Sequence, residues 1–202
     1  SSDWLNISLA YSKVLLDLGE HREARKIITT VIEKREHLYG SSSAQCLIAK
    51  AVLADIMAFT EKESGEVLQL MNEIVDAIND GVVISREFEI ESKVALAGAM
   101  YTSHAFTFGK ESTLSLVEDA IVLLERLIPV IKEELGLLHP VSIEARMNLA
   151  GCYMYVNRIN DSIPLLETAL DDARVVFGPN HLQTAEATTA LGIFYYLTGR
   201  TR

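Results

Sequence analysis

Apolar residues recur along this chain at intervals of three and four, the spacing that places them on one face of a helix. One such stripe consists of Ala24, Ile27, Ile28, Val31 and Ile32, and Gly40 follows it as a helix-ending residue. Stripes of this kind predict helices joined by short turns. We place the helices at about 4–18, 20–38, 43–60, 64–80, 85–107, 112–135, 140–156, 159–176 and 181–198.

A large residue followed by a small one recurs along the chain at a nearly constant interval. The pairs are Tyr11-Ser12, Leu53-Ala54, Leu96-Ala97, Leu149-Ala150 and Leu191-Gly192, with steps of 42, 43, 53 and 42 residues. A small side chain lets a neighbouring helix approach to the short end of the usual range of roughly 8–10 Å between axes. The pattern therefore predicts stacked helix pairs. We place the repeats at about 4–40, 43–81, 85–136, 139–178 and 181–202, the last being incomplete.

Two repeats carry local features. The third is longer than its neighbours, and we expect the excess to lengthen both of its helices around residues 106–113. In the fourth, Asn157 and Arg158 form the turn, and we expect Asn160 or Asp161 to cap the helix that follows.

The order of these residues resembles the tetratricopeptide repeat, which places a large, a small and an aromatic residue on its first helix, then a turn glycine. The fourth repeat supplies Leu149, Ala150, Tyr153 and, in place of the glycine, Asn157. The linkers 136–140 (GLLHP) and 178–181 (GPNH) are similar to those of the long repeats of kinesin light chains. The resemblance implies an all-α, right-handed α-solenoid of helix-turn-helix repeats, a single domain over residues 1–202, with first helices lining its concave side.

That concave side would carry the binding residues. The candidates for contact with a peptide are Glu91, Tyr101, Glu144, Met147, Asn148, Gly151, Tyr155, Glu186 and Tyr196, at positions that we expect to be exposed. Asn148 carries the sharpest hypothesis, because the corresponding Asn in related repeats hydrogen-bonds the backbone of a bound peptide. A side-chain amide suits that task because it both donates and accepts.

Each of these residue types also has a structural explanation. Glu91, Glu144 and Glu186 occupy the same slot in three repeats, near a helix N-terminus, where a carboxylate favours the helix dipole by roughly 0.3–1 kcal/mol. The tyrosines can pack between repeats or contact a ligand. At this stage both explanations stay open for both groups.

Charge and composition narrow the functional classes. The net charge of −10 argues against a surface that binds nucleic acid or an anionic membrane. The sequence contains no run of about 18 apolar residues, so we expect no membrane span. The histidines are not paired at metal-ligand spacing, and His139 and His181 have linker positions that suggest helix capping or loop packing. No phosphate loop or nucleophile motif is present. We therefore expect no enzyme activity, cofactor or metal.

The predicted function is a non-catalytic scaffold or adaptor that binds a basic or amphipathic peptide, or a helix, of a protein partner in the concave groove. The alternatives are a rigid segment of a cytoskeletal or ciliary assembly, and a regulatory arm of a multidomain protein. Cys46 and Cys152, which show no C-x-x-C pattern, favour a reduced, cytoplasmic setting. The chain begins without Met, so we expect a piece of a longer protein. Further repeats or a partner would cover its apolar last helix.

Overall fold

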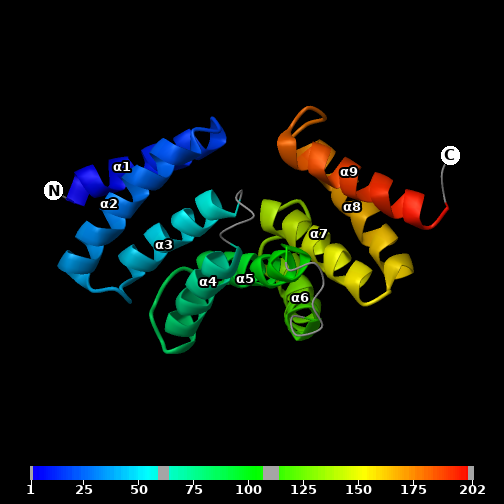
Figure 1. The fold of residues 1–202 in the computed structure, drawn as a ribbon, viewed down its shortest axis with the longest axis horizontal. Helices are drawn as coiled ribbons and strands as arrows, with labels where there is room; N and C mark the ends of the chain where they lie inside the picture. Colours follow the sequence, from blue (N-terminus) through cyan, green and yellow to red (C-terminus); the bar gives the residue numbers. More distant parts are fainter. Residues whose placement is uncertain (1, 59–63, 107–113, 200–202) are drawn as a thin grey trace. The chain divides into compact units, whose positions relative to one another are not determined.

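The computed structural model describes residues 2–58, 64–106 and 114–199, and every regular element in these ranges is a helix (Figure 1). The helices are α1 (Ser2–Asp17), α2 (His21–Tyr39), α3 (Ala44–Met57), α4 (Ser64–Asn79), α5 (Arg86–Phe106), α6 (Leu114–Glu134), α7 (Pro140–Tyr155), α8 (Ile159–Val176) and α9 (Leu182–Leu197). Their bounds lie within a few residues of the predicted ones. The all-α class is confirmed.

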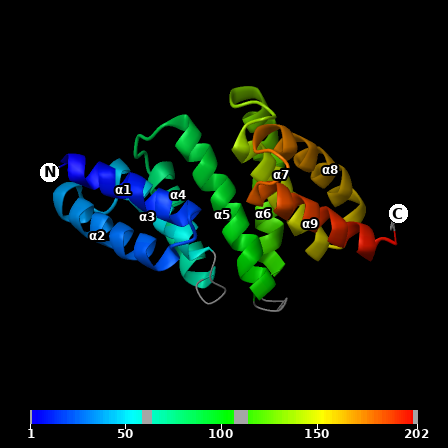
Figure 2. The ribbon, with the colours of Figure 1, turned by 90° about the horizontal axis from the view of Figure 1, so that it is seen from above.

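The chain divides into two compact units, residues 1–92 and 93–202. In the first unit α1 packs on α2, α2 on α3 and α3 on α4; in the second α6 packs on α7, α7 on α8 and α8 on α9 (Figures 1 and 2). In these six pairs, helices adjacent in sequence are adjacent in space, which is the arrangement of an α-solenoid. The single domain over 1–202 and the right-handed superhelix stay predictions.

The small residue of each of the first four repeats lies where helices meet. Ser12, Ala54, Ala97 and Ala150 are at most 2% exposed. The Ser162 hydroxyl of α8 donates to the carbonyl of Ala150 over 3.0 Å, so α8 reaches the backbone of α7. The close helix approach predicted from these residues is confirmed there.

The first helix of the fifth repeat differs from the other four. Its small residue, Gly192 of α9, is exposed, because no helix in the described ranges covers that face. In the third repeat α5 and α6 have 21 residues each, against 16 in α7, so both helices are lengthened as predicted. The segment 107–113 between them lies outside the described residues.

The turn of the fourth repeat requires an unusual backbone conformation. Asn157 has φ +59°, the left-handed region that favours glycine and that asparagine tolerates better than most residues. This explains how an asparagine replaces the glycine of the family pattern. The helix that follows begins at Ile159, so Asn160 and Asp161 lie inside its first turn and the predicted cap is wrong.

The linker histidines cap the helices that follow them. His139 Nδ1 accepts from the Val141 backbone N–H over 3.4 Å, and His181 Nδ1 accepts from the Gln183 N–H over 3.2 Å. Each side chain satisfies one of the unpaired N–H groups of a first helical turn. The capping role predicted for both residues is confirmed.

Two buried cations occupy the same slot, three residues before the large anchor residue, in the second and fourth repeats. These are Lys50 of α3 and Arg146 of α7. Lys50 Nζ donates to the Ser41 carbonyl over 3.3 Å and forms ion pairs with Glu73 and, over 3.3 Å, with Glu36. The lysine thereby connects the linker before α3 to the helices on either side.

Arg146 makes the equivalent set of contacts in the fourth repeat. Its Nη2 donates to the Leu137 carbonyl over 3.1 Å and to Asp172 Oδ2 over 2.8 Å, while Nε donates to the Ser142 carbonyl over 3.0 Å. Ser41 and Leu137 both stand twelve residues before their anchors, so the two cations bind the same point of the linker. Each buried charge is paired and hydrogen-bonded, as burial requires.

Candidate functional site

Eight of the nine candidate residues lie in the second unit, on α5, α7 and α9, and Glu91 lies in the first. Four of the eight come together where α5 meets α7: Tyr101, Asn148, Gly151 and Tyr155. We call this group the α5–α7 surface.

Two glycines let α5 and α7 approach closely. A Cβ atom at Gly98 of α5 would lie 3.0 Å from Asn148 Nδ2, and one at Gly151 of α7 would lie 2.8 Å from Tyr101 Cζ. Each helix therefore supplies the space that a polar side chain of the other helix fills. Glycine inside a helix costs roughly 0.5–1 kcal/mol relative to alanine, so the close fit has a local energetic cost.

Aromatic rings hold the two tyrosines in place. The ring of Tyr155 lies 5.8 Å from that of Tyr101, tilted by 58°, and meets His104 edge-on at 4.8 Å. Burial raises the pKa of the Tyr101 hydroxyl to about 12, and the nearby Tyr155 and Cys152 add to the rise. Burial also raises the pKa of Tyr155. Both hydroxyls are therefore neutral at physiological pH and able to donate or accept.

The polar ends of these side chains have hydrogen-bonding capacity to spare. The Asn148 amide and the Tyr101 and Tyr155 hydroxyls have no hydrogen-bond partner among residues 2–58, 64–106 and 114–199, and all three side chains are half-buried. Partly buried polar groups of this kind are satisfied by water or by a ligand. The α5–α7 surface therefore offers three sites for hydrogen bonds to a partner.

All nine candidates were expected to be exposed, and five are not: besides the half-buried Tyr101, Asn148 and Tyr155, these are Gly151 and Met147. Gly151 is buried beneath Tyr101, because the glycine is what allows the ring to lie there. Met147 is half-buried and packs on the core cluster formed by Ile143, Ala169 and Ala173. Both residues support the surface from below.

The remaining candidates of the second unit are exposed. Glu144 lies on α7, and Glu186 and Tyr196 lie on α9, where Tyr196 is 75% exposed. Nearby protein raises the pKa of Glu186 by desolvation, while His181 acts in the opposite direction. These residues give the second unit an acidic and aromatic exposed surface.

Glu91 belongs to a different electrostatic group, in the first unit. The carboxyl of Asp55 is exposed to water at its surface although protein surrounds it on most sides, and desolvation raises its pKa to about 6. Lys13 lowers this pKa and Glu91 raises it. Asp55, which sequence reasoning did not single out, and Glu91 are thus two carboxylates that repel each other beside one lysine.

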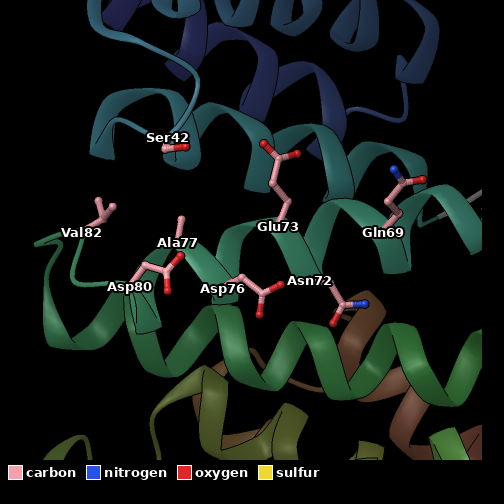
Figure 3. A pocket seen from close by; sticks show the side chains of 8 residues that line it. All are labelled: Ser42, Gln69, Asn72, Glu73, Asp76, Ala77, Asp80 and Val82. Carbon is pink, nitrogen blue, oxygen red and sulfur yellow. The ribbon is translucent and has the colours of Figure 1, made fainter.

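A separate pocket of about 510 Å³ lies in the first unit on α4 (Figure 3). Glu73 reaches from α4 toward α3, where it pairs with Lys50, and so is already engaged (Figure 3). In the part of the chain that the structure describes, no three His, Cys, Asp or Glu side chains are grouped so as to hold a metal. The pocket is lined by Ser42, Gln69, Asn72, Glu73, Asp76, Ala77, Asp80 and Val82.

Comparison with known proteins agrees with this architecture. A model of the tetratricopeptide repeat family matches residues 141–202. Two crystal structures from Podosopora anserina, described as those of a kinesin light chain with nearly identical TPR-like repeats, superpose on 97% and 99% of this chain with TM-scores of 0.68. The chain has the fold of tetratricopeptide-like repeats.

These structures are related to the tetratricopeptide-like chain by fold alone. Both are 18% identical to it, and the matches cover 87% and 89% of their own chains. BtubC (BKLC) from P. vanneervenii matches 96% of the chain over 66% of its own length, with 14% identity and a TM-score of 0.50. No curated protein matches the chain in sequence. The helices in the described ranges are too short or too polar to cross a membrane.

Proposed function

We propose that this tetratricopeptide-like chain is a non-catalytic scaffold or adaptor whose α5–α7 surface binds a peptide of a protein partner. Proteins of this fold commonly mediate protein–protein interactions. The observation that carries the proposal is the cluster of the Asn148 amide and the Tyr101 and Tyr155 hydroxyls, which have no hydrogen-bond partner among the described residues. An amide and two neutral hydroxyls can pair with both the N–H and the C=O groups of a peptide backbone.

Charge favours a basic or amphipathic peptide. Glu144 and Glu186 are exposed in the same unit as the cluster, and the whole chain carries a net charge of −10. Complementary charge accelerates association and selects among partners more than it strengthens binding. Replacing both glutamates with Gln should therefore slow association with a basic peptide and weaken its dependence on salt. The cytoplasmic location and a cytoskeletal partner stay predictions.

Peptides selected from a random library on the wild-type chain would provide the ligand for a direct test. Asn148→Ala and Tyr155→Phe should each weaken binding about tenfold by calorimetry, because each removes groups that hydrogen-bond the peptide. The unfolding midpoint of Tyr155→Phe should stay the same, because its hydroxyl bonds to no described residue. Asn148→Ala also removes the side chain that packs on Gly98, so its midpoint should fall.

Asn160→Ala is the matched control, since Asn160 is an exposed asparagine on α8. Its affinity for the selected peptides should equal that of the wild-type chain. Full retention of binding by both Asn148→Ala and Tyr155→Phe would refute the proposed site, and so would an equal loss with Asn160→Ala.

A further inference from the structure

An apolar stripe runs along the exposed face of α1. It consists of Trp4, Ile7, Tyr11 and Val14 of α1 and of Leu18, which directly follows the helix, and these residues are between 44% and 70% exposed. Their steps of 3, 4, 3 and 4 residues are those of the a and d positions of a heptad repeat. Five large apolar residues in one exposed row mark an interaction surface rather than scattered surface residues.

The buried side of the same helix faces the rest of its unit. Leu5, Ser8, Ser12 and Leu15 are buried there, and Leu5 and Leu15 belong to the core shared with α2 and α3. Helix α1 is therefore fully packed on its inner side without using the stripe. The fold of the first unit does not require the exposed residues to be apolar.

In the second, fourth and fifth repeats, the positions that correspond to Trp4 and Ile7 are buried and carry smaller side chains. The positions of Trp4 and Ile7 correspond to Cys46 and Ala49 in α3, which are fully buried in the core with residues of α2. The corresponding residues of α7 and α9 are also small or polar and buried: Ser142, Ala145, Thr184 and Ala187.

The size of the side chains in α1 therefore argues against a standard repeat helix on this face. A helix that packs as α2 does on α3 needs small residues at the positions of Trp4 and Ile7. These two large side chains would prevent such a helix from approaching closely. Large apolar residues at heptad spacing instead favour side-by-side helix packing in which each large residue enters a gap of the facing helix.

A basic border runs along one side of the stripe. Lys34 Nζ of α2 lies 3.9 Å over the ring of Trp4. Arg22, Lys26, Thr30 and Lys34 follow one another at four-residue steps and so share one side of α2. Because α1 and α2 lie side by side and run in opposite directions (Figures 1 and 2), and Lys34 contacts Trp4 at one end, we infer that this row follows the stripe.

We propose that α1 docks an amphipathic helix of another protein, with an apolar heptad seam on the stripe and acidic residues along the border formed by Arg22, Lys26 and Lys34. A second copy of this chain docked through the same stripe would bring an identical basic border next to this one, and like charges repel, so the border disfavours a second copy as the occupant. This surface lies in the first unit and is independent of the α5–α7 surface.

A designed peptide can serve as the probe. It has about four heptads with Ile at a, Leu at d and Glu at e and g, and repulsion between its own glutamates opposes its self-association. A second peptide carries Lys at e and g. By fluorescence anisotropy the chain should bind the Glu peptide at least about tenfold more tightly than the Lys peptide at low salt, and high salt should narrow the difference.

The stripe is tested by a double substitution, Ile7→Asp with Val14→Asp, which should weaken binding of the Glu peptide at least about tenfold. Val175→Asp is the matched control, because Val175 of α8 is an exposed helical valine outside the stripe. Its affinity should equal that of the wild-type chain. If the double variant fails to fold by circular dichroism, Lys26→Glu with Lys34→Glu replaces it and should reduce the preference for the Glu peptide.

Three outcomes would overturn the proposal. Equal affinity for the two peptides would refute the preference for an acidic partner. An absence of binding to both peptides would refute the docking of a helix on the stripe. A wild-type dimer in sedimentation that Ile7→Asp with Val14→Asp dissociates would identify a second copy of the chain as the occupant.

Discussion

Replacing Gly151 with alanine should change stability in opposite directions, depending on whether residue 101 is tyrosine. A Cβ atom at position 151 would lie 2.8 Å from Cζ, 3.0 Å from Cε2 and 3.1 Å from the hydroxyl oxygen of Tyr101, whereas ordinary van der Waals contact begins at 3.4 Å. The ring would have to move by several tenths of an ångström, and the neighbouring Tyr155 ring limits its movement.

Two energies compete in this substitution. Alanine is favoured over glycine inside a helix by roughly 0.5–1 kcal/mol. Overpacking against the Tyr101 ring costs about 1–3 kcal/mol. The net effect of Gly151→Ala in the wild-type chain is therefore a destabilisation of up to about 2.5 kcal/mol. In a Tyr101→Ala background the ring is gone, and the same substitution should stabilise by roughly 0.5–1 kcal/mol.

The assay is a double-mutant cycle of four proteins unfolded in urea. The expected coupling between positions 101 and 151 is about 1–3 kcal/mol. Gly192→Ala is the control, because no atom of another described element lies within 4 Å of a Cβ added at Gly192 in α9, so it should stabilise the chain in either background. The reasoning is refuted if Gly151→Ala has the same effect in both backgrounds to within about 0.5 kcal/mol.

Substitutions at three further positions test individual features. Arg146→Ala should destabilise by about 3 kcal/mol in urea unfolding, because it leaves Asp172 without its cation and removes three hydrogen bonds. Asn157→Gly should leave the thermal midpoint nearly unchanged, whereas Asn157→Ala should cost about 1 kcal/mol at its positive φ. The raised pKa of Asp55, about 6, means that its share of stability is present below about pH 4 and is lost as pH rises through 6. Asp55→Asn should remove this slope and stabilise at pH 7 by less than about 1 kcal/mol, since water screens the exposed carboxylate.

The fold was predictable because its information is periodic. Recurrence of Leu149-Ala150 and its counterparts fixes the spacing of the helix pairs, and the three- and four-residue apolar rhythm fixes each helix. The prediction was wrong at a helix end, where local contacts and not the apolar pattern determine which residue begins the helix. The cap predicted for α8 failed because Arg158, not Asn160 or Asp161, precedes its first residue.

The candidate site was predictable only in part. Position in the repeat identified Asn148, Tyr101 and Tyr155, which do come together. The role of Gly151 could not be recognised, because it depends on a tyrosine 50 residues earlier on another helix. The apolar pattern did not predict that Lys50 and Arg146 are buried, because both residues are charged. The sequence signal for them is the recurrence of a cation at the same position of two repeats.

The stripe on α1 shows a further limit of sequence patterns. Large apolar residues lie on two sides of that helix, at Leu5 and Leu15 on one and at Ile7 and Val14 on the other. Periodicity assigns both rows to a helix but cannot tell which row is buried. That distinction requires the positions of α2 and α3.

The contacts of Lys50 and Arg146 limit how such repeats can be exchanged. The lysine pairs with a glutamate 23 residues later, and the arginine pairs with an aspartate 26 residues later. A chimaera that joined the first helix of one repeat to the second helix of the other would misalign cation and carboxylate by nearly one helical turn. A hybrid array would therefore need the linker, the cation and the acid to be transferred together, because the contact between them depends on three separate segments of the chain.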